Sequence, residues 1–482
     1  MLDSLPQSCR VGWLVIRTLL VAADKNSCFG GKATDVSATR RNFLKTAGVL
    51  TASELTRNLH LLSLAEEPTP RRGPNDEIQI ALIGAGIRGQ QDCASALEVP
   101  NTRLIAVADC YDGRLKHARE KWGQDIFVTR NYAEVFARPD IDAVIIATPD
   151  HWHKQAAIDA MTAGKDVYLE KPMIHLYSDG PEIIGTARKT SRILQVGSQR
   201  VSNMLYAKAK ELLNSGAIGK LNLVNAFWDR TSFMGAWSYT VPPDASPETC
   251  DWPRFLGSAP KIPWNPERFF QWRKWTDYGS GVAGDLFVHL FSGTHFITGS
   301  QGPTRAVATG GLRYWKDGRN VPDVMVAMFD YPEQFNLTLR VNQIAGGREA
   351  EGFLFTGSEG TMEISSSGLT LTSYAAPKDP GMTIDTFAID EQQQYRDNYV
   401  SKFPETANPA LADNRVETFV LPRTYSDTVE HFRNFFRSVR TRTAPVEDCV
   451  FGFRAAGAAL LSNLSMERGS MVHWNPETMK IG

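Results

Sequence analysis

Residues 142–172 read DAVIIATPDHWHKQAAIDAMTAGKDVYLEKP, and their hydrophobic pattern predicts a strand, a helix and a second strand. Residues 143–147 are apolar and rich in β-branched side chains, which is typical of a parallel strand buried on both faces. Gly164 is expected to end the helix, because the residue after a helix often adopts the left-handed conformation that glycine allows. Residues 166–169 are expected to form the second strand. Because ligands of open α/β sheets bind beyond the carboxyl ends of the strands, Lys171 lies where chemistry is expected.

A glycine-rich turn lies upstream of this region. Residues 78–83 form an apolar strand that leads directly into GAGIRG at residues 84–89, which has the pattern G-x-G-x-x-G and opens a helix. The glycines let the backbone turn tightly and approach a pyrophosphate, which then rests on the helix N-terminus. A second strand over residues 103–108 ends at Asp109, where a carboxylate accepts hydrogen bonds from the hydroxyls of an adenosine ribose. The pattern predicts binding of NAD rather than NADP, because the Asp109 carboxylate repels the 2′-phosphate of NADP. Arg114 lies nearby in the sequence and could bind that phosphate, so NADP stays an alternative.

The first 200 residues continue this alternation of strands and helices. Further strands are expected near residues 126–128 and 193–197, with helices at about 113–121, 132–136 and 183–189. Repeated β-α alternation at these spacings indicates a doubly wound parallel sheet of the Rossmann type, and therefore an α/β fold.

Length and composition limit the class of protein. The chain has 482 residues, 42% of them hydrophobic, and a net charge of −1. This length favours two domains after a leader, with divisions at residues 1–75, 76–198 and 199–482. The balanced charge gives no electrostatic reason to expect nucleic acid or an anionic membrane as a partner. The six cysteines include no C-x-x-C pair, so neither a metal site nor a disulfide framework is expected.

The leader carries its own signal. Residues 39–45 read TRRNFLK and resemble a twin-arginine export signal, which would extend to about residue 65. An apolar segment at residues 11–23 is too short to span a bilayer. We therefore expect export to the periplasm. The alternative is a basic amphipathic segment on a cytoplasmic protein.

Together, several stretches carry a resemblance to a known family. The glycine turn, Asp109, residues 147–172, QVGSQR at 195–200 and KELLNSGAIGK at 210–220 resemble the Gfo/Idh/MocA family of sugar oxidoreductases. The resemblance implies that the second domain is α+β, with a large open, mostly antiparallel sheet and helices on one face. It also implies a homo-oligomer, a dimer or tetramer, that associates through the outer face of that sheet.

Local patterns in the second half agree with this architecture. Residues 375–416 are polar and rich in Pro, Asp, Gln and Asn, so an excursion loop is expected there. Strands are expected at residues 220–230, 304–312, 325–331, 335–341, 352–357 and 361–364, and closing helices at 427–440 and 447–464.

Three residues are candidates for the chemistry. Lys171 ends the Glu-Lys-Pro stretch, where it can exchange a proton or stabilise charge on oxygen. Asp285 and His289 follow a glycine run and are spaced i, i+4, which places both on one face of a helix. The family carries an Asp-x-x-x-His pair at this point. By that resemblance His289 is the proton acceptor, and Asp285 orients the substrate or tunes the imidazole.

Other residues are assigned to ligands. Arg273 and Tyr278, with Lys171 and His289, are expected to contact the substrate, and His295 is expected to be structural. The cofactor-binding set comprises Gly84, Gly86, Ile87, Arg88, Gly89, Asp109, Thr148, Pro149, His153, Glu170 and Lys171.

The expected function is an NAD(P)-dependent oxidoreductase that moves hydride between nicotinamide and a hydroxyl of a sugar, polyol or glycoside. An alternative is a redox-neutral enzyme that keeps its NAD bound, because an exported enzyme has no soluble NAD pool to recycle it. Such an enzyme transfers hydride between two sugars, or cleaves a glycoside as some members of the family do. A third reading is a non-catalytic sugar-binding protein.

Overall fold

The computed structural model describes residues 59–61, 77–347, 349–374, 380–403 and 415–482. The twin-arginine motif at residues 39–45 lies outside the described residues. Leu59–Leu61 form a short strand, β1, which pairs in parallel with β15 (Arg415–Val420). These three residues of the predicted leader thus pair with the edge of the large sheet, whose free backbone groups allow it, and the boundary at residue 75 stays a prediction.

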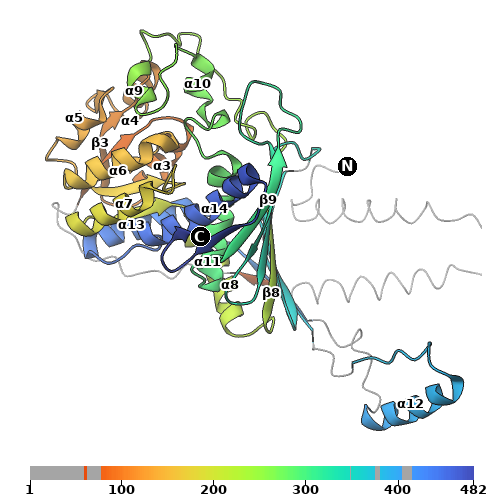
Figure 1. Ribbon diagram of the computed structural model, residues 1–482. Coiled ribbons are helices and arrows are strands. Elements are labelled where there is room, and N and C mark those ends of the chain that lie inside the picture. The colour runs from red at the N-terminus through yellow and green to blue at the C-terminus, as the bar shows by residue number, and fades with distance from the viewer. Residues whose placement is uncertain (1–58, 62–76, 348, 375–379, 404–414) are drawn as a thin grey trace, which may run out of the picture. The chain divides into compact units, whose positions relative to one another are not determined.

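The first half of the described chain is a parallel sheet between helices (Figure 1). Its strand order is β4-β3-β2-β5-β6-β7, with all neighbours parallel, which confirms the doubly wound Rossmann sheet. The elements are β2 (Ile78–Ile83), α3 (Ile87–Leu97), β3 (Thr102–Ala108), α4 (Asp112–Trp122), β4 (Phe127–Thr129), α5 (Tyr132–Phe136), β5 (Ala143–Ile146), α6 (His153–Thr162), β6 (Asp166–Glu170), α7 (Asp179–Thr190) and β7 (Leu194–Gly197).

The second half is built on an 11-stranded sheet. Its order is β1-β15-β14-β13-β12-β8-β11-β10-β9-β16-β17, and most neighbours are antiparallel, as predicted. The strands not yet given are β8 (Leu221–Asp229), β9 (Arg305–Gly311), β10 (Val324–Asp330), β11 (Asn336–Asn342), β12 (Ala350–Gly357), β13 (Gly360–Ser365), β14 (Gly368–Ser373), β16 (Val472–Asn475) and β17 (Lys480–Ile481). Strands β14 to β17 were not predicted, although β14 and β16 alternate polar and apolar residues, because they are short.

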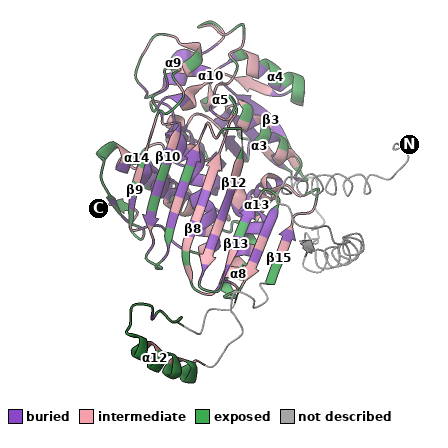
Figure 2. Ribbon diagram, turned by 90° about the vertical axis from the view of Figure 1, so that its right-hand side faces the viewer, coloured by how far each residue is buried: buried purple, intermediate pink, exposed green. Residues whose placement is uncertain are grey.

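Helices cover one face of the large sheet (Figure 1), and buried residues alternate with more exposed ones along its strands (Figure 2). The helices in this half of the chain are α8 (Met204–Asn214), α9 (Trp252–Leu256), α10 (Pro266–Phe270), α11 (Val288–Thr298), α12 (Ile389–Lys402), α13 (Asp427–Thr441) and α14 (Cys449–Arg468), and those that lie against the large sheet are α8, α11 and α14. Helix α12 lies within the excursion predicted at residues 375–416, and none of its residues is buried.

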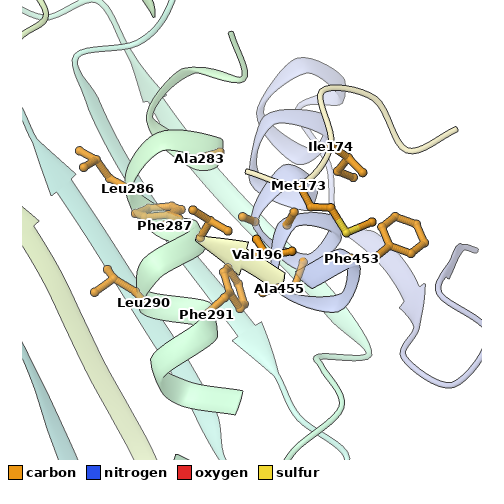
Figure 3. Packing of buried hydrophobic residues seen from close by; sticks show 14 of the residues in the cluster. Met173, Ile174, Val196, Ala283, Leu286, Phe287, Leu290, Phe291, Phe453 and Ala455 are labelled. Atoms are coloured by element: carbon orange, nitrogen blue, oxygen red, sulfur yellow. The ribbon is translucent and has the colours of Figure 1, made fainter. Parts of the chain in front are cut away.

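One hydrophobic core joins the two sheets (Figure 3). Val196 of β7 packs in the same cluster as Phe291 of α11 and Phe453 of α14. Gly452 permits this contact, because a Cβ there would lie 2.4 Å from Cγ2 of Val196. Helix α14 is long and apolar enough to cross a membrane by length and composition, but 61% of its apolar window is buried in the fold, as in the core helix of a folded protein.

A long connection between β8 and α11 crosses back to the Rossmann sheet. It contains α9 and α10, whose aromatic side chains form a separate buried cluster with Tyr111. Asp251 N–H donates to Cys110 O at 2.8 Å, and Asp112 N–H donates to Thr249 O at 3.0 Å. We call residues 239–278 the roof segment. Trp252 and Trp275 belong to this cluster, and Trp264 packs against it. The division of the chain at residue 198 stays a prediction.

Candidate active site

A pocket of about 700 Å³ opens at the carboxyl ends of the Rossmann strands. Its walls come from the loops after β2, β3, β5 and β6, from the end of β8, from the roof segment and from the turn before α11. The pocket therefore lies where an open α/β sheet binds ligands. Among the predicted site residues, those that line it are Gly84, Gly86, Ile87, Arg88, Asp109, Thr148, Pro149, Lys171, Arg273, Asp285 and His289.

The glycine turn fits a dinucleotide. Gly84 has a φ of 89°, and a Cβ there would lie 2.6 Å from Ala147 O. At Gly89, a Cβ would lie 2.0 Å from Gly84 O. Any side chain at Gly84 or Gly89 would therefore clash with backbone atoms, so the turn needs glycine at both positions. Gly86 differs, because the nearest atom to its Cβ would be the Arg114 guanidinium at 3.7 Å. The space over Gly86 thus belongs to the pocket, next to the unpaired N–H groups of the first turn of α3.

Asp109 is buried at the end of β3 and holds the turn in place. Its Oδ2 accepts a hydrogen bond from Ala85 N–H at 2.7 Å, and its Oδ1 accepts one from Tyr111 N–H at 2.9 Å. The Arg114 guanidinium lies 3.4 Å from Oδ1. Since each carboxylate oxygen has two acceptor sites, Asp109 keeps acceptor capacity for a ribose hydroxyl. NAD would be held by this carboxylate and by the turn at residues 84–88.

Lys171 and Asp285 meet at the far end of the pocket. The Lys171 ammonium donates to Asp285 Oδ1 at 2.9 Å and to Asp285 O at 2.8 Å. Arg273 Nε donates to Oδ1 at 3.1 Å, and the Trp237 indole donates to Oδ2 at 3.0 Å. Burial alone would raise the pKa of Asp285, but the charges of Lys171 and Arg273 hold it well below its usual range. Asp285 is therefore a fixed anion that anchors Lys171.

His289 lies beside this group rather than bonded to it. Asp285 is in a π-helical turn, Ala283–Phe287, and His289 is in the first turn of α11. Among the described residues no hydrogen bond joins the two side chains. The His289 ring instead packs on the Trp228 indole at 5.2 Å. Burial lowers the pKa of His289 well below 6.5, and the charges of Lys171 and Arg200 lower it further, while the charge of Asp285 partly offsets that lowering. The predicted role of Asp285 in tuning the imidazole therefore stays a prediction.

Several predicted ligand residues lie behind the pocket wall. Glu170 is buried and accepts hydrogen bonds from Arg88 Nε at 3.0 Å and Gln199 Nε2 at 2.6 Å. His153 is buried, with its ring nitrogens 2.7 Å from Pro172 O and 3.0 Å from Thr148 O. Tyr278 belongs to the aromatic cluster of the roof segment. These residues support the wall instead of forming it, as does Gly89.

The sequence reasoning missed other pocket residues. Arg200, Trp228 and Arg230 line the same end as His289, together with Tyr239, Trp272 and Asp427. The Trp228 indole contacts the guanidinium groups of Arg200 at 5.8 Å and Arg230 at 5.6 Å. The many aromatic residues of this region could have indicated three of these positions, Trp228, Tyr239 and Trp272. Arg200 ends the QVGSQR stretch that carries part of the family resemblance, but it was not assigned to the site. Nothing local marks Arg230.

Within the described ranges no group of three or more His, Cys, Asp or Glu side chains could hold a metal ion. His295 is buried on α11, and its Nε2 lies 3.0 Å from the Tyr331 hydroxyl, which is a structural contact.

Comparison with family models agrees with this geometry. Residues 78–198 match "Oxidoreductase family, NAD-binding Rossmann fold", and residues 256–363 match "GFO/IDH/MocA C-terminal domain". These are the domains of a Gfo/Idh/MocA family protein. The Rossmann domain of this Gfo/Idh/MocA protein is thus NAD-binding, in accord with the open space over Gly86.

The chain is also similar to curated proteins and to solved structures, at low sequence identity. The chain is 30% identical over 205 residues to an "Alpha-N-acetylgalactosaminidase" of Shewanella oneidensis, and 29% identical over 205 residues to a "Glycosyl hydrolase family 109 protein" of Shewanella baltica. Each match covers 38% of this chain and only 44% of the relative. Among solved structures, a levoglucosan dehydrogenase in complex with NADH has a TM-score of 0.61 at 16% identity, over 82% of this chain and 99% of that chain. That likeness concerns the fold of the Gfo/Idh/MocA protein alone.

Proposed function

We propose that the protein is an NAD-dependent oxidoreductase that acts on a hydroxyl group of a sugar, polyol or glycoside. The observation that carries this proposal is the meeting of Lys171 with Asp285 and His289 in the NAD-binding pocket. When bound, the nicotinamide would accept a hydride from a carbinol carbon or return it. The chain has to bind and orient the sugar and to take up or return the hydroxyl proton.

Lys171 is suited to hold the substrate oxygen. An ammonium has three donors, and two of those of Lys171 are used by Asp285 O and Oδ1. The third remains for a substrate oxygen, on which it stabilises charge as the carbonyl forms or is reduced. The fixed charge of Asp285 sets the position of this ammonium.

His289 is suited to accept the hydroxyl proton. Its lowered pKa keeps the imidazole neutral at pH 7, so a ring nitrogen is free to accept. Nδ1 of His289 has no hydrogen-bond partner among the described residues. The His289 side chain is partly buried against the Trp228 indole and lines the pocket, so a bound hydroxyl can approach this ring.

A second candidate is a redox-neutral enzyme that keeps its NAD through each cycle and cleaves a glycoside. The names of the two Shewanella relatives favour it. So does the roof segment, because Phe255, Phe269 and Phe270 line the pocket that the Rossmann loops open. A tightly covered nucleotide would suit an enzyme that does not exchange it.

One experiment tests both candidates. The full chain is purified without added nucleotide and denatured, and the released nucleotide is identified. The purified protein is then given sugars with NAD, and aryl glycosides without it. NADH formation from a sugar supports the dehydrogenase, whereas stoichiometric bound NAD with aglycone release and no net NADH supports the redox-neutral enzyme. A protein that neither contains nor binds NAD would refute both.

We also propose a homo-oligomer formed through the outer face of the large sheet, and export by the twin-arginine route. Exposed apolar side chains on this sheet include Val307 on β9 and Val326 and Met328 on β10. Light scattering of the wild type and a Val326→Lys/Met328→Lys variant tests the first point. Secretion of the full chain with Arg40-Arg41 replaced by Lys-Lys tests the second.

A further inference from the structure

The pocket has an uneven balance of charge. Its cationic side chains are Arg88, Arg114, Arg130, Lys171, Arg200, Arg230, Arg254 and Arg273. In the described part of the chain, all but one of them form an ion pair with a carboxylate. The exception is Arg230.

Arg230 follows directly after β8 and is partly buried. Its Nη1 donates to Gly235 O at 3.1 Å, which uses one of the five donors of the guanidinium. Glu349 is a nearby acid, since backbone hydrogen bonds and the charge of Arg230 lower the pKa of its carboxyl, but no ion pair joins the two side chains among the described residues. The Glu349 carboxylate accepts from Thr231 N–H at 3.1 Å and from Ser232 N–H at 3.2 Å. Most donors of Arg230 thus have no acceptor among the described residues.

The position of Arg230 assigns it to the substrate end. Its guanidinium lies 5.6 Å from the Trp228 ring, and the His289 ring lies 5.2 Å from the same indole. Its charge is also one of those that lower the pKa of Asp285. The phosphates of a dinucleotide are expected instead at the turn of residues 84–88, on the Rossmann sheet.

A partly desolvated cation without a partner is costly unless a ligand supplies the anion. Arginine is well matched to planar oxyanions, which it binds with two parallel hydrogen bonds. A neutral sugar would leave this charge unpaired. A sugar that carries a carboxylate or a sulfate would pair it.

We propose that Arg230 recognises an acidic group on the carbohydrate, so that the substrate is a uronic acid, a uronide or a sulfated sugar. This inference rests on the proposed function, since it concerns the sugar that lies against Lys171 and His289. Trp228 holds the guanidinium in place through its ring face. The neighbouring cation, Arg200, is already paired with Glu351 and does not serve the same purpose.

The test measures binding rather than turnover. The full-length protein, saturated with NAD, is titrated in a calorimeter with matched probes: methyl glucuronide against methyl glucoside, methyl galacturonide against methyl galactoside, and glucose 6-sulfate against glucose. We expect at least one acidic probe to bind about tenfold more tightly than its neutral partner, which is about 1.4 kcal/mol. The preference should weaken as sodium chloride rises from about 50 to about 500 mM, because salt screens the pair.

Variants decide whether Arg230 is responsible. Arg230→Gln should abolish the preference and leave the affinity for the neutral sugar within about twofold, and Arg230→Lys should restore part of it. The matched control is Arg313→Gln, since Arg313 also donates to a backbone carbonyl, Gly310 O at 2.9 Å, and does not line the pocket. This control should keep the wild-type preference.

Two results would overturn the proposal. One is that no acidic probe binds more tightly than its neutral partner. The other is that the preference survives in Arg230→Gln. Tighter binding of the uronides would identify a carboxylate as the recognised group, and tighter binding of glucose 6-sulfate would identify a sulfate. Failure of the proposed function would look different, since it would appear as absent NAD binding before any sugar is added.

Discussion

The ammonium nitrogen of Lys171 lies 2.9 Å from Oδ1 of Asp285, although the two residues are 114 positions apart. Lys171 follows a Rossmann strand, and Asp285 lies in the turn that leads into a helix under the large sheet. This ion pair therefore spans the two halves of the fold at the wall of the pocket. It links the NAD-binding sheet to the elements that would hold the substrate.

Removing either partner should abolish turnover but not nucleotide binding. Asp285→Asn leaves Lys171 and Arg273 without their shared anion, and Lys171→Met removes the donor to the substrate oxygen. We expect turnover to fall at least about 100-fold in each, as for loss of a positioned acid-base group. Bound NAD should stay within about twofold, because the glycine turn is untouched.

The matched control for the first substitution is Asp277→Asn. Asp277 pairs with Arg268 in the same stretch of chain but does not line the pocket. Turnover that is lost equally in Asp277→Asn would indicate general damage to the roof segment, and unchanged turnover in Asp285→Asn and Lys171→Met would refute their roles.

His289 gives a prediction about pH. A base must be neutral to accept a proton, and the pKa of His289 lies well below 6.5 because of burial and the charges of Lys171 and Arg200. The imidazole therefore stays active as the pH falls through 6.5. The acid limb of kcat for sugar oxidation should lie below pH 6.5, and His289→Gln should lower kcat about 100-fold and remove that limb. A limb that persists unchanged in His289→Gln would assign it to another group.

The glycine turn separates a binding role from a folding role. Gly86→Val places a side chain in the open space over the turn, so it should reduce bound NAD at least about tenfold with little change in the melting temperature. Gly89→Ala drives a Cβ toward Gly84 O, so it should lower the melting temperature of the apoprotein. Fluorescence of bound NADH and thermal unfolding distinguish them. Equal effects of both substitutions on both measurements would contradict this division.

Much of the fold was accessible from sequence because its signals are local. The apolar strand before GAGIRG, the break at Gly164 and the acid after β3 are set by residues a few positions apart, and they are found where they were predicted. Long, alternating strands such as β10 and β11 carry the same kind of local signal.

The site depended on contacts that sequence spacing does not encode. The spacing of Asp285 and His289 predicted a shared helix face. It predicted neither the π-helical turn nor the hydrogen bonds that Lys171, Arg273 and Trp237 donate to the Asp285 carboxylate. Arg230 could not be recognised for a related reason. An arginine after a strand is common, and it becomes unusual only when every neighbouring cation is already paired.

The roof segment predicts slow exchange of the nucleotide. The Tyr111 hydroxyl donates to Asp244 Oδ1 at 2.5 Å, and its ring packs edge-on against Phe270 at 5.1 Å. Tyr111→Phe keeps the ring contact and loses the hydrogen bond, so NAD should dissociate several-fold faster while its site chemistry is retained. The matched control is Tyr177→Phe, whose hydroxyl donates to Gly457 O at 2.9 Å in the core. Equal dissociation rates in wild type and Tyr111→Phe would mean that the roof does not limit release.

Buried histidines predict loss of stability in mild acid. His431 on α13 lies with Nε2 2.8 Å from Val196 O and Nδ1 2.8 Å from Ser202 Oγ, and burial lowers its pKa to about 4. The unfolded chain takes up a proton as the pH falls below about 6.5, whereas the folded chain does so only near 4. Stability from this residue is therefore complete above pH 6.5. It declines by up to about 1.4 kcal/mol per pH unit towards pH 4.

His431→Gln should lower stability at pH 7.5 through its lost contacts but make the decline between pH 6.5 and 5 shallower than in the wild type. Urea unfolding across that range measures both effects. His117→Gln is the control, because it removes a histidine whose side chain is 51% exposed on α4. Parallel curves for wild type and His431→Gln would contradict the assignment, and the remaining slope would then belong to other buried groups such as His295, whose pKa is lowered to about 3 by burial.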